Sequence, residues 1–224
     1  MLTTIADRAT TVGRMERGLP AAGATVIVFA RWPRAGAVKR RLGRSVGGAR
    51  ANRVYRALLN RSLAVASELA HVRRILLVAE RGDRPWFSRN IGRKRWCIAV
   101  QEGDGLGERM LNAFNRYCDG QNPVVLIGSD IADCTAADLR RAVRALTSAD
   151  VVIGPVADGG YWLIGMREPL AVLFAGIDWS EPTVFACTMD RVKRSKRSHR
   201  IVGRRNDIDR GRDLGILRRR SMRR

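Results

Sequence analysis

The 224-residue sequence has no apolar run long enough to cross a membrane, since a bilayer span needs about 18–20 apolar residues. Its longest apolar runs, such as Thr25–Ala30 and Val124–Gly128, have the length of a β-strand. The N-terminus also lacks the apolar region of a secretory signal. Only four cysteines occur, and none are paired at zinc-like spacing. A chain of this length does not need disulfides, so we interpret the cysteines as reduced thiols and predict a cytoplasmic protein.

Nucleic-acid recognition motifs and aromatic stacking runs are also absent, although the formal net charge is +21. The excess of lysine and arginine lies in residues 1–100 and 191–224, whereas residues 101–190 carry more acidic than basic side chains. The basic ends could attract nucleotide phosphates, RNA or anionic lipid, or could reflect an arginine-rich proteome. We do not expect nucleic acid as the partner. An acidic middle segment is what a divalent-cation site requires.

Apolar strand-like runs alternate with helix-like spacing over residues 1–150. This alternation predicts an α/β fold with a doubly wound, mostly parallel sheet. We expect one domain over residues 23–216, a flexible leader over 1–22 and a basic tail over 217–224. In such sheets, ligands bind at the carboxyl ends of the strands. The strand ends of interest therefore follow Ala30, Val100, Gly128 and Val156.

The local patterns predict individual elements. Strands are expected at Ala24–Ala30, Arg74–Ala79, Cys97–Val100, Pro123–Gly128, Asp150–Val156, Tyr161–Met166 and, more weakly, Arg200–Val202. Helices are expected over Gly47–Ala70 and Glu108–Cys118, and a third begins after an N-cap at Thr135, with Asp138 in its first turn. Residues 80–95 are predicted to be turns, and little regular structure is predicted beyond Pro169.

The first candidate loop, Arg31–Leu42, combines glycine with several cations. It contains neither a dinucleotide-binding G-x-G-x-x-G nor a P-loop motif. Backbone amides and guanidinium groups could nevertheless wrap a polyphosphate there. The alternative is a solvated basic loop. The candidate nucleotide-binding residues in this loop are Arg31, Gly36, Lys39 and Arg41.

The second candidate loop, Gln101–Met110, has three glycines within five residues. Glycine lets the backbone approach a ligand closely or adopt a positive φ. Gly105, Gly107 and Arg109 are therefore further nucleotide-binding candidates. The alternative is a tight turn from strand to helix, in which the charged residues only open the helix.

Carboxylates at two places indicate a metal site. Asp130 follows the buried run that ends at Gly128, where an unpaired carboxylate would be costly and Mg²⁺ would be favoured. The alternative is an Asx turn before the helix at Thr135. Asp207 and Asp209 form a second acidic pair, one of which could bind metal while the other fixes the backbone. Salt bridges to neighbouring arginines are the competing explanation. Asp133 is a weaker candidate.

Another candidate cluster, Gly154–Tyr161, joins two apolar runs through Asp158-Gly159-Gly160. A plain hairpin turn would account for this sequence. The preceding Gly-Pro and the many small residues instead suggest space for a substrate. We take Asp158 as the candidate catalytic base, and Gly159, Gly160 and Tyr161 as candidate acceptor-pocket residues.

With these clusters, the chain resembles the bacterial glycosyltransferase-A-like family known as selenodomain-associated transferases, which is related to phospholactate and molybdenum-cofactor guanylyltransferases. The matching motifs are Phe-Ala-Arg-Trp-Pro-Arg-Ala-Gly-Ala-Val-Lys-Arg-Arg-Leu, Gln-Glu-Gly-Asp-Gly-Leu-Gly-Glu-Arg-Met, Ile-Gly-Ser-Asp-Ile, Gly-Pro-Val-Ala-Asp-Gly-Gly-Tyr-Trp-Leu-Ile-Gly and Asp-Ile-Asp. The resemblance runs from about Thr25 to Leu214 and also includes Trp179–Val184. It departs from the family in having Arg40 where the family usually has threonine. It also has Ala132 where the family usually has proline. We expect the absence of this proline to loosen the turn after Asp130.

The resemblance implies the nucleotide-diphospho-sugar transferase fold and the use of Mg²⁺ or Mn²⁺. It implies that Lys39 and Arg41 contact nucleotide phosphates, that Asp130 holds the metal with Asp207 or Asp209, and that Asp158–Tyr161 line the acceptor pocket. We therefore expect a metal-dependent, glycosyltransferase-like enzyme that uses a nucleotide or sugar-nucleotide donor and a small-molecule acceptor. The first alternative is a guanylyltransferase-like nucleotidyltransferase acting on a small phosphorylated acceptor. The non-enzyme alternative is a basic RNA- or membrane-associating protein on a degenerate transferase scaffold.

Overall fold

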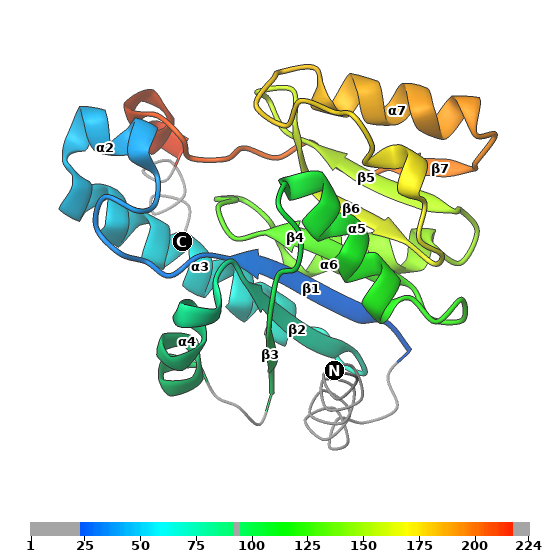
Figure 1. The fold of residues 1–224 in the computed structure, drawn as a ribbon, viewed down its shortest axis with the longest axis horizontal. Helices are drawn as coiled ribbons and strands as arrows, with labels where there is room; N and C mark the ends of the chain where they lie inside the picture. The colour runs from blue at the N-terminus through cyan, green and yellow to red at the C-terminus, as the bar shows by residue number, and fades with distance from the viewer. Residues whose placement is uncertain (1–22, 92–94, 217–224) are drawn as a thin grey trace, which may run out of the picture.

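The computed structural model of the chain describes residues 23–91 and 95–216, so the predicted leader (1–22) and basic tail (217–224) lie outside the described residues. The described part contains one seven-stranded sheet, in the order β3-β2-β1-β4-β6-β5-β7 (Figure 1). The strands are β1 (Thr25–Ala30), β2 (Arg73–Val78), β3 (Cys97–Val100), β4 (Val124–Gly128), β5 (Val151–Pro155), β6 (Tyr161–Met166) and β7 (His199–Ile201).

The sheet is mostly parallel, as the alternating pattern predicts. Strands β3, β2, β1 and β4 run in one direction, and β7 is parallel to β5. Strand β6 is antiparallel to both β4 and β5, because a short hairpin joins β5 to β6. The carboxyl ends of β1, β3, β4 and β5 consequently lie at the same edge of the sheet. All the loops that the sequence predicts to bind ligands leave from that edge.

Helices cover both faces of the sheet. The buried side chains of α3, α4 and α6 pack on one face, and those of α5 and α7 pack on the other. Alternate residues of β1 enter the two clusters, with Val26 and Val28 on one side and Ile27 and Phe29 on the other. The helices are α2 (Arg40–Val46), α3 (Gly48–Ser67), α4 (Arg84–Asn90), α5 (Leu106–Tyr117), α6 (Ala136–Ala145) and α7 (Val184–Arg194), with short 3₁₀ turns η1 (Arg81–Asp83), η2 (Ala171–Leu173) and η3 (Gly211–Asp213).

Several predicted boundaries agree closely with the structure. Strands β3 and β6 have the predicted bounds, and the start of α6 is a capping box in which Thr135 and Asp138 bond each other's backbone amides. Helix α3 is shorter than predicted and ends at Ser67. In the described ranges, no helix is long and apolar enough to span a membrane.

Three elements correct the sequence predictions. The basic loop does not extend to Leu42, because α2 begins at Arg40. Helix α4 lies within the stretch expected to be turns and begins next to Pro85, a residue suited to a first helical turn. Helix α7 was missed because its buried stripe includes the polar Thr188, which donates a hydrogen bond to the carbonyl oxygen of Val184 at 2.9 Å.

Candidate functional site

Tyr55 joins the two strand ends at which the site begins. Strands β1 and β4 are parallel neighbours with Phe29 beside Gly128, so Arg31 and Ser129 leave the sheet next to each other. The backbone N–H of Arg31 donates to the Tyr55 hydroxyl at 2.9 Å, and the hydroxyls of Tyr55 and Ser129 are 3.0 Å apart. Tyr55 and Ser129 are buried. This network holds the loops after β1 and β4 in one arrangement.

Lys39 lies at the centre of the charged cluster. Its backbone is left-handed, with φ 49° and ψ 46°, at the N-cap of α2, and only 6% of its side chain is exposed. Its Nζ lies 2.9 Å from Asp130 Oδ2 and 4.0 Å from Asp209 Oδ1. Burial alone would lower the pKa of Lys39, but Asp130, followed by Asp209 and Asp207, raises it above its ordinary value. Lys39 is therefore a charged ammonium held among three carboxylates.

A small apolar cluster places these charges. Leu42 of α2, Ala132 of the loop after β4, and Ile208 pack together and are almost completely buried. Ile208 separates Asp207 from Asp209, and alternate residues of an extended segment share one face. Both carboxylates lie close enough to Lys39 to raise its pKa, so neither of the pair is turned away from the charged cluster, although the sequence pattern predicts this for one of them. In Figure 1, the C-terminal η3 lies beside α2, which it contacts through Gly211.

Hydrogen bonds join the loop after β4 to the segment that carries the acidic pair. The backbone N–H of Ala132 donates to the carbonyl oxygen of Asn206 at 3.2 Å, a bond that a proline could not donate. This bond offsets the loosening expected from the missing proline. Asn206 in turn donates to both carboxylate oxygens of Asp133, at 3.0 and 3.1 Å. Asp133 thus fixes the backbone, and Asp130 remains the carboxylate that faces the charged cluster.

Asp207 shows how closely the carboxylates approach one another. Burial and the neighbouring charges of Asp158 and Asp130 raise the pKa of Asp207 to about 6, against the opposing effect of Lys39. Asp158 belongs to the loop between β5 and β6, where its Oδ1 accepts a hydrogen bond from the Gly160 N–H at 3.1 Å. The fold therefore brings together acidic residues that follow β4, follow β5 and lie near the C-terminus.

Replacing Asp207 with asparagine is expected to stabilise the metal-free protein at neutral pH. Because the pKa of Asp207 is raised on folding to about 6, its ionisation costs stability as the pH rises from about 4 to about 6. After discounting for partial exposure to solvent, we expect a gain of about 1–2 kcal/mol at pH 7.5 and almost none at pH 4. Urea unfolding of both proteins at the two pH values measures this difference. An equal gain at both pH values would contradict the electrostatic explanation.

The loop between β5 and β6 is anchored to the start of α7. Gly159 has φ 93°, and a β-carbon on it would lie 1.8 Å from the carbonyl oxygen of Pro182. Its own carbonyl oxygen accepts the N–H of Phe185 at 2.8 Å. Tyr161 packs edge-on against Trp179, with ring centroids 6.1 Å apart, and its hydroxyl oxygen is buried. Tyr161 therefore supports this loop from within the core.

The glycine-rich segment at the start of α5 packs against Trp179, the residue that Tyr161 also contacts. A β-carbon on Gly107 would lie 2.5 Å from the indole nitrogen of Trp179, so only glycine leaves room for this packing. Arg109 donates from Nε to the carbonyl oxygen of Gly103 at 2.8 Å, which braces the turn. Gly105 is the N-cap of α5 and has open space around its α-carbon. The structure thus connects this turn to the β5–β6 loop through Trp179.

The remaining candidates lie on the loop after β1 and on α2. Gly36 has φ 78° and open space around it, and Arg31 is exposed. Arg34 stacks over the ring of Trp32, with 4.5 Å between its guanidinium carbon and the ring centroid. Arg41 is largely exposed, and its Nη1 lies 3.2 Å from Asp209 Oδ2. This loop can therefore offer Arg31 and the backbone around Gly36 to an anion.

The carboxylates of this site could bind a divalent cation only if oxygens of a bound ligand filled its remaining coordination positions. Within residues 23–91 and 95–216, no three side chains of Asp, Glu, His or Cys lie close enough together to enclose a metal ion. Asp130 and Asp207 are nevertheless close enough that their charges repel, which raises the pKa of Asp207 after the larger effects of burial and Asp158. Mg²⁺ commonly takes one or two carboxylates and fills its other positions with phosphate oxygens and water. These two carboxylates fit that kind of site.

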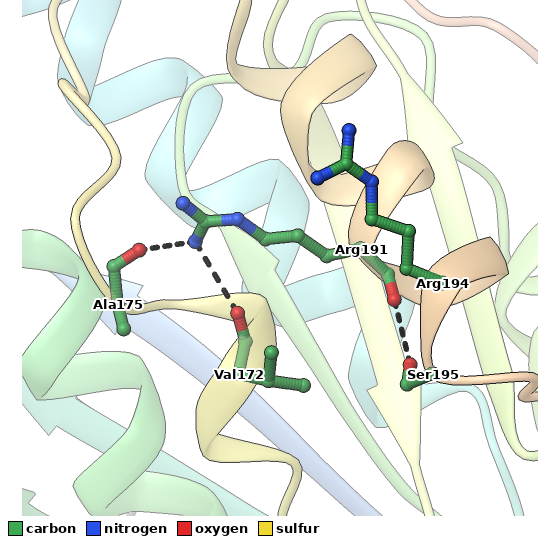
Figure 2. A pocket seen from close by; sticks show the side chains of 5 residues that line it. All are labelled: Val172, Ala175, Arg191, Arg194 and Ser195. Atoms are coloured by element: carbon green, nitrogen blue, oxygen red, sulfur yellow. Dashed lines mark hydrogen bonds between the residues drawn. The ribbon is translucent and has the colours of Figure 1, made fainter.

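An open hollow of about 430 Å³ lies elsewhere, where the last turns of α7 face η2 (Figure 2). Arg191 spans it and donates to the carbonyl oxygens of Val172, at 3.2 Å, and Ala175. The Ser195 hydroxyl donates to the Arg191 carbonyl oxygen at 2.6 Å. Because α7 begins beside Gly159, these residues at its other end are distant from the carboxylates. The hydrogen bonds of Arg191 fasten the segment after β6 to α7.

The fold and this edge of the sheet define the class of protein, a nucleotide-diphospho-sugar transferase fold. A candidate nucleotide-diphospho-sugar transferase from Desulfovibrio desulfuricans G20 is similar in structure, with a TM-score of 0.83, 33% identity, and coverage of 89% of this chain and 88% of that chain. The family model described as "Uncharacterized protein conserved in bacteria (DUF2064)" matches residues 62–181, and the chain belongs to this family. No curated protein matches the sequence.

More distant solved structures share the fold. The inositol-1-phosphate CTP transferase from T. maritima has a TM-score of 0.61 and 12% identity, with coverage of 90% of this chain and 96% of that chain. Rv0371C from Mycobacterium tuberculosis H37Rv, in complex with manganese, has a TM-score of 0.55 and 18% identity, with coverage of 88% and 98%. At these identities the likeness concerns the fold. Nucleotide-dependent transferases thus share this chain's scaffold.

Proposed function

We propose that the chain is a metal-dependent, glycosyltransferase-like enzyme that uses a nucleotide or sugar-nucleotide donor. The observation that carries the proposal is the buried Lys39 ammonium, 2.9 Å from Asp130, with Asp207 and Asp209 beside it at the carboxyl edge of the sheet. A cation among carboxylates is the chemistry needed to hold a diphosphate together with a metal ion. The motif resemblance to selenodomain-associated transferases and guanylyltransferases supports the same proposal.

In this proposal, Lys39 and Arg41 bind the donor phosphates, and Arg31, Gly36 and the turn around Gly105, Gly107 and Arg109 complete the nucleotide site. Asp130 and Asp207, with Asp209 beside them, would hold Mg²⁺ or Mn²⁺. When bound, the divalent ion would neutralise charge that develops on the leaving diphosphate. The loop of Asp158, Gly159 and Gly160 would line the acceptor pocket, with Gly159 fixing the loop against Pro182 and Tyr161 supporting it from the core.

Asp158 is the proposed general base. An acceptor hydroxyl oxygen attacks the anomeric carbon of the donor, and its proton passes to the Asp158 carboxylate. The bond between the anomeric carbon and the diphosphate oxygen breaks, and the electron pair leaves with the diphosphate. The hydrogen bond from the Gly160 N–H orients the Asp158 side chain for this role.

The alternative is nucleotidyl transfer to a small phosphorylated acceptor. The acceptor oxygen would then attack the α-phosphorus of a nucleoside triphosphate and release pyrophosphate. The similarity in fold to the T. maritima CTP transferase, at a TM-score of 0.61, favours keeping this alternative. Both reactions place the departing phosphates at Lys39 and the carboxylates, so the identity of the donor decides between them.

A thermal-shift screen of nucleotides and sugar nucleotides, with and without Mg²⁺ or Mn²⁺, tests the proposed function. A ligand at about 100 times its Kd stabilises the native state by about 2.7 kcal/mol, which corresponds to a rise in Tm of roughly 5–10 °C for a chain of this size. We expect at least one ligand to give such a rise only with the metal present. A sugar nucleotide would favour glycosyl transfer, and a nucleoside triphosphate would favour nucleotidyl transfer.

The same screen includes RNA and anionic lipid vesicles at several salt concentrations. The degenerate-scaffold alternative predicts salt-sensitive binding to these polyanions without any metal-dependent nucleotide response. That pattern would refute the enzyme proposal.

A further inference from the structure

The ammonium of Lys39 already forms ion pairs with two of the carboxylates proposed to hold the metal, Asp130 and Asp209. Its Nζ is 2.9 Å from Asp130 and 4.0 Å from Asp209, and its side chain is 6% exposed. Lys39 is also one of the few non-glycine residues in the described chain with a left-handed backbone, at φ 49°. Such a conformation is uncommon for lysine, and it occurs at the N-cap of α2, from which the side chain reaches Asp130. The protein therefore supplies its own cation to this site.

A divalent ion bound to Asp130 would bring a second positive charge next to this ammonium. At such separations, and partly shielded from water, like charges repel strongly. Lys39 has an unbranched, flexible stem, so its Nζ can move without a change in fold. The same loop carries the exposed Arg31 and the open backbone at Gly36, which the proposed function assigns to the nucleotide site.

We infer that Lys39 is an exchangeable counter-ion. In the resting protein it neutralises Asp130, and on ligand binding its ammonium moves from Asp130 to the donor phosphates as the divalent ion takes its place. This regulation of the site rests on the proposed function. Metal alone binds weakly, because the carboxylates are open to it only in the fraction of molecules in which Lys39 has moved away. Anything that draws Lys39 to a phosphate raises the metal affinity, so metal and nucleotide bind cooperatively.

The decisive comparison is between Lys39→Met and Arg41→Ala. Both remove one positive charge beside Asp209, but only Lys39 contacts Asp130, whereas Arg41 is 60% exposed and pairs with Asp209 alone. Methionine keeps the length and the apolar stem of lysine. Binding of Mn²⁺ alone to the full chain is measured from the electron paramagnetic resonance signal of free Mn²⁺. We expect Lys39→Met to tighten Mn²⁺ binding at least tenfold and Arg41→Ala to change it by no more than threefold.

The second measurement is the affinity of each protein for tripolyphosphate in the absence of metal, determined by calorimetry. We expect Lys39→Met to weaken it at least tenfold, so that one substitution moves the two affinities in opposite directions. Unchanged or weaker Mn²⁺ binding would overturn the proposal and make Lys39 a structural partner of Asp130. Tighter Mn²⁺ binding with unchanged tripolyphosphate binding would also overturn it, because Lys39 would then not move to phosphate.

Two features keep the experiment interpretable. If Lys39→Met does not fold, as judged by circular dichroism, Lys39→Gln replaces it with the same expected outcomes. The Mn²⁺ arm needs no nucleotide, so it can succeed even if the nucleotide screen finds no ligand. Failure of the proposed function and failure of the counter-ion exchange are therefore distinguishable.

Discussion

Replacing Asp130 with asparagine is expected to remove the metal-dependent part of nucleotide binding. Asparagine preserves the size of the side chain but takes away the negative charge that attracts a divalent cation. Taking the loss of one contact between a charged side chain and the metal as about 2 kcal/mol, we expect affinity measured with Mg²⁺ to fall roughly thirtyfold. Calorimetric titration of the nucleotide found in the screen, with and without Mg²⁺, measures the effect.

Asp133→Asn is the matched control. It makes the same chemical change three residues further along, but the Asp133 carboxylate accepts hydrogen bonds from Asn206 and fixes the backbone. We expect this variant to lose stability while its nucleotide binding keeps its dependence on Mg²⁺. If Asp130→Asn left that dependence intact, the metal role of Asp130 would be wrong.

Replacing Gly159 with alanine is expected to destabilise the protein by about 2–4 kcal/mol. The new β-carbon would lie 1.8 Å from the Pro182 carbonyl oxygen, and the φ of 93° is strained for any residue with a β-carbon. The loop would have to leave the start of α7 and break the hydrogen bond from the Phe185 N–H. We expect Tm to fall by roughly 5–15 °C. Differential scanning calorimetry measures the change.

Gly160→Ala is the control for the neighbouring position. A β-carbon there would meet its nearest neighbours, Asp158 Oδ1 and Val156 Cγ2, at 3.5 Å, which is ordinary contact. We expect its Tm to remain within a few degrees of the original protein. Equal Tm values for the two variants would show that Gly159 does not pack against Pro182 in solution.

Many of the elements could be predicted from local patterns. The continuous apolar run of β1 predicts a strand buried on both faces, and its residues do enter two core clusters. Thr135, followed three residues later by Asp138, predicts a helix start, which the capping box confirms. The sequence pattern does not predict helix α7, because the polar Thr188 interrupts its buried apolar stripe. The hydrophobic repeat of a helix or strand can therefore be recognised from the sequence when every buried position is apolar.

The site partners could be predicted only in part. The rule that ligands bind at the carboxyl ends of parallel strands directs attention to the residues after β1, β4 and β5, and the structure brings charged residues from these three places together. The rule could not identify Tyr55, because the hydroxyl of Ser129 that bonds it lies 74 residues away. Tyr55 had one visible signal: it lies on the apolar stripe of a predicted helix, and buried tyrosine hydroxyls usually find a partner.

The sequence by itself determined the α/β class, the strands, and the four strand ends at which charged and glycine-rich residues gather, because these depend on the chemistry and spacing of near neighbours. Only the tertiary structure decided which of those residues meet. Lys39 and Asp130 are 91 residues apart and pair because β1 and β4 are adjacent, and Asp207 and Asp209 join them because Ile208 is buried against Leu42 and Ala132. Contacts between distant segments arise from packing and strand order, which no local pattern encodes.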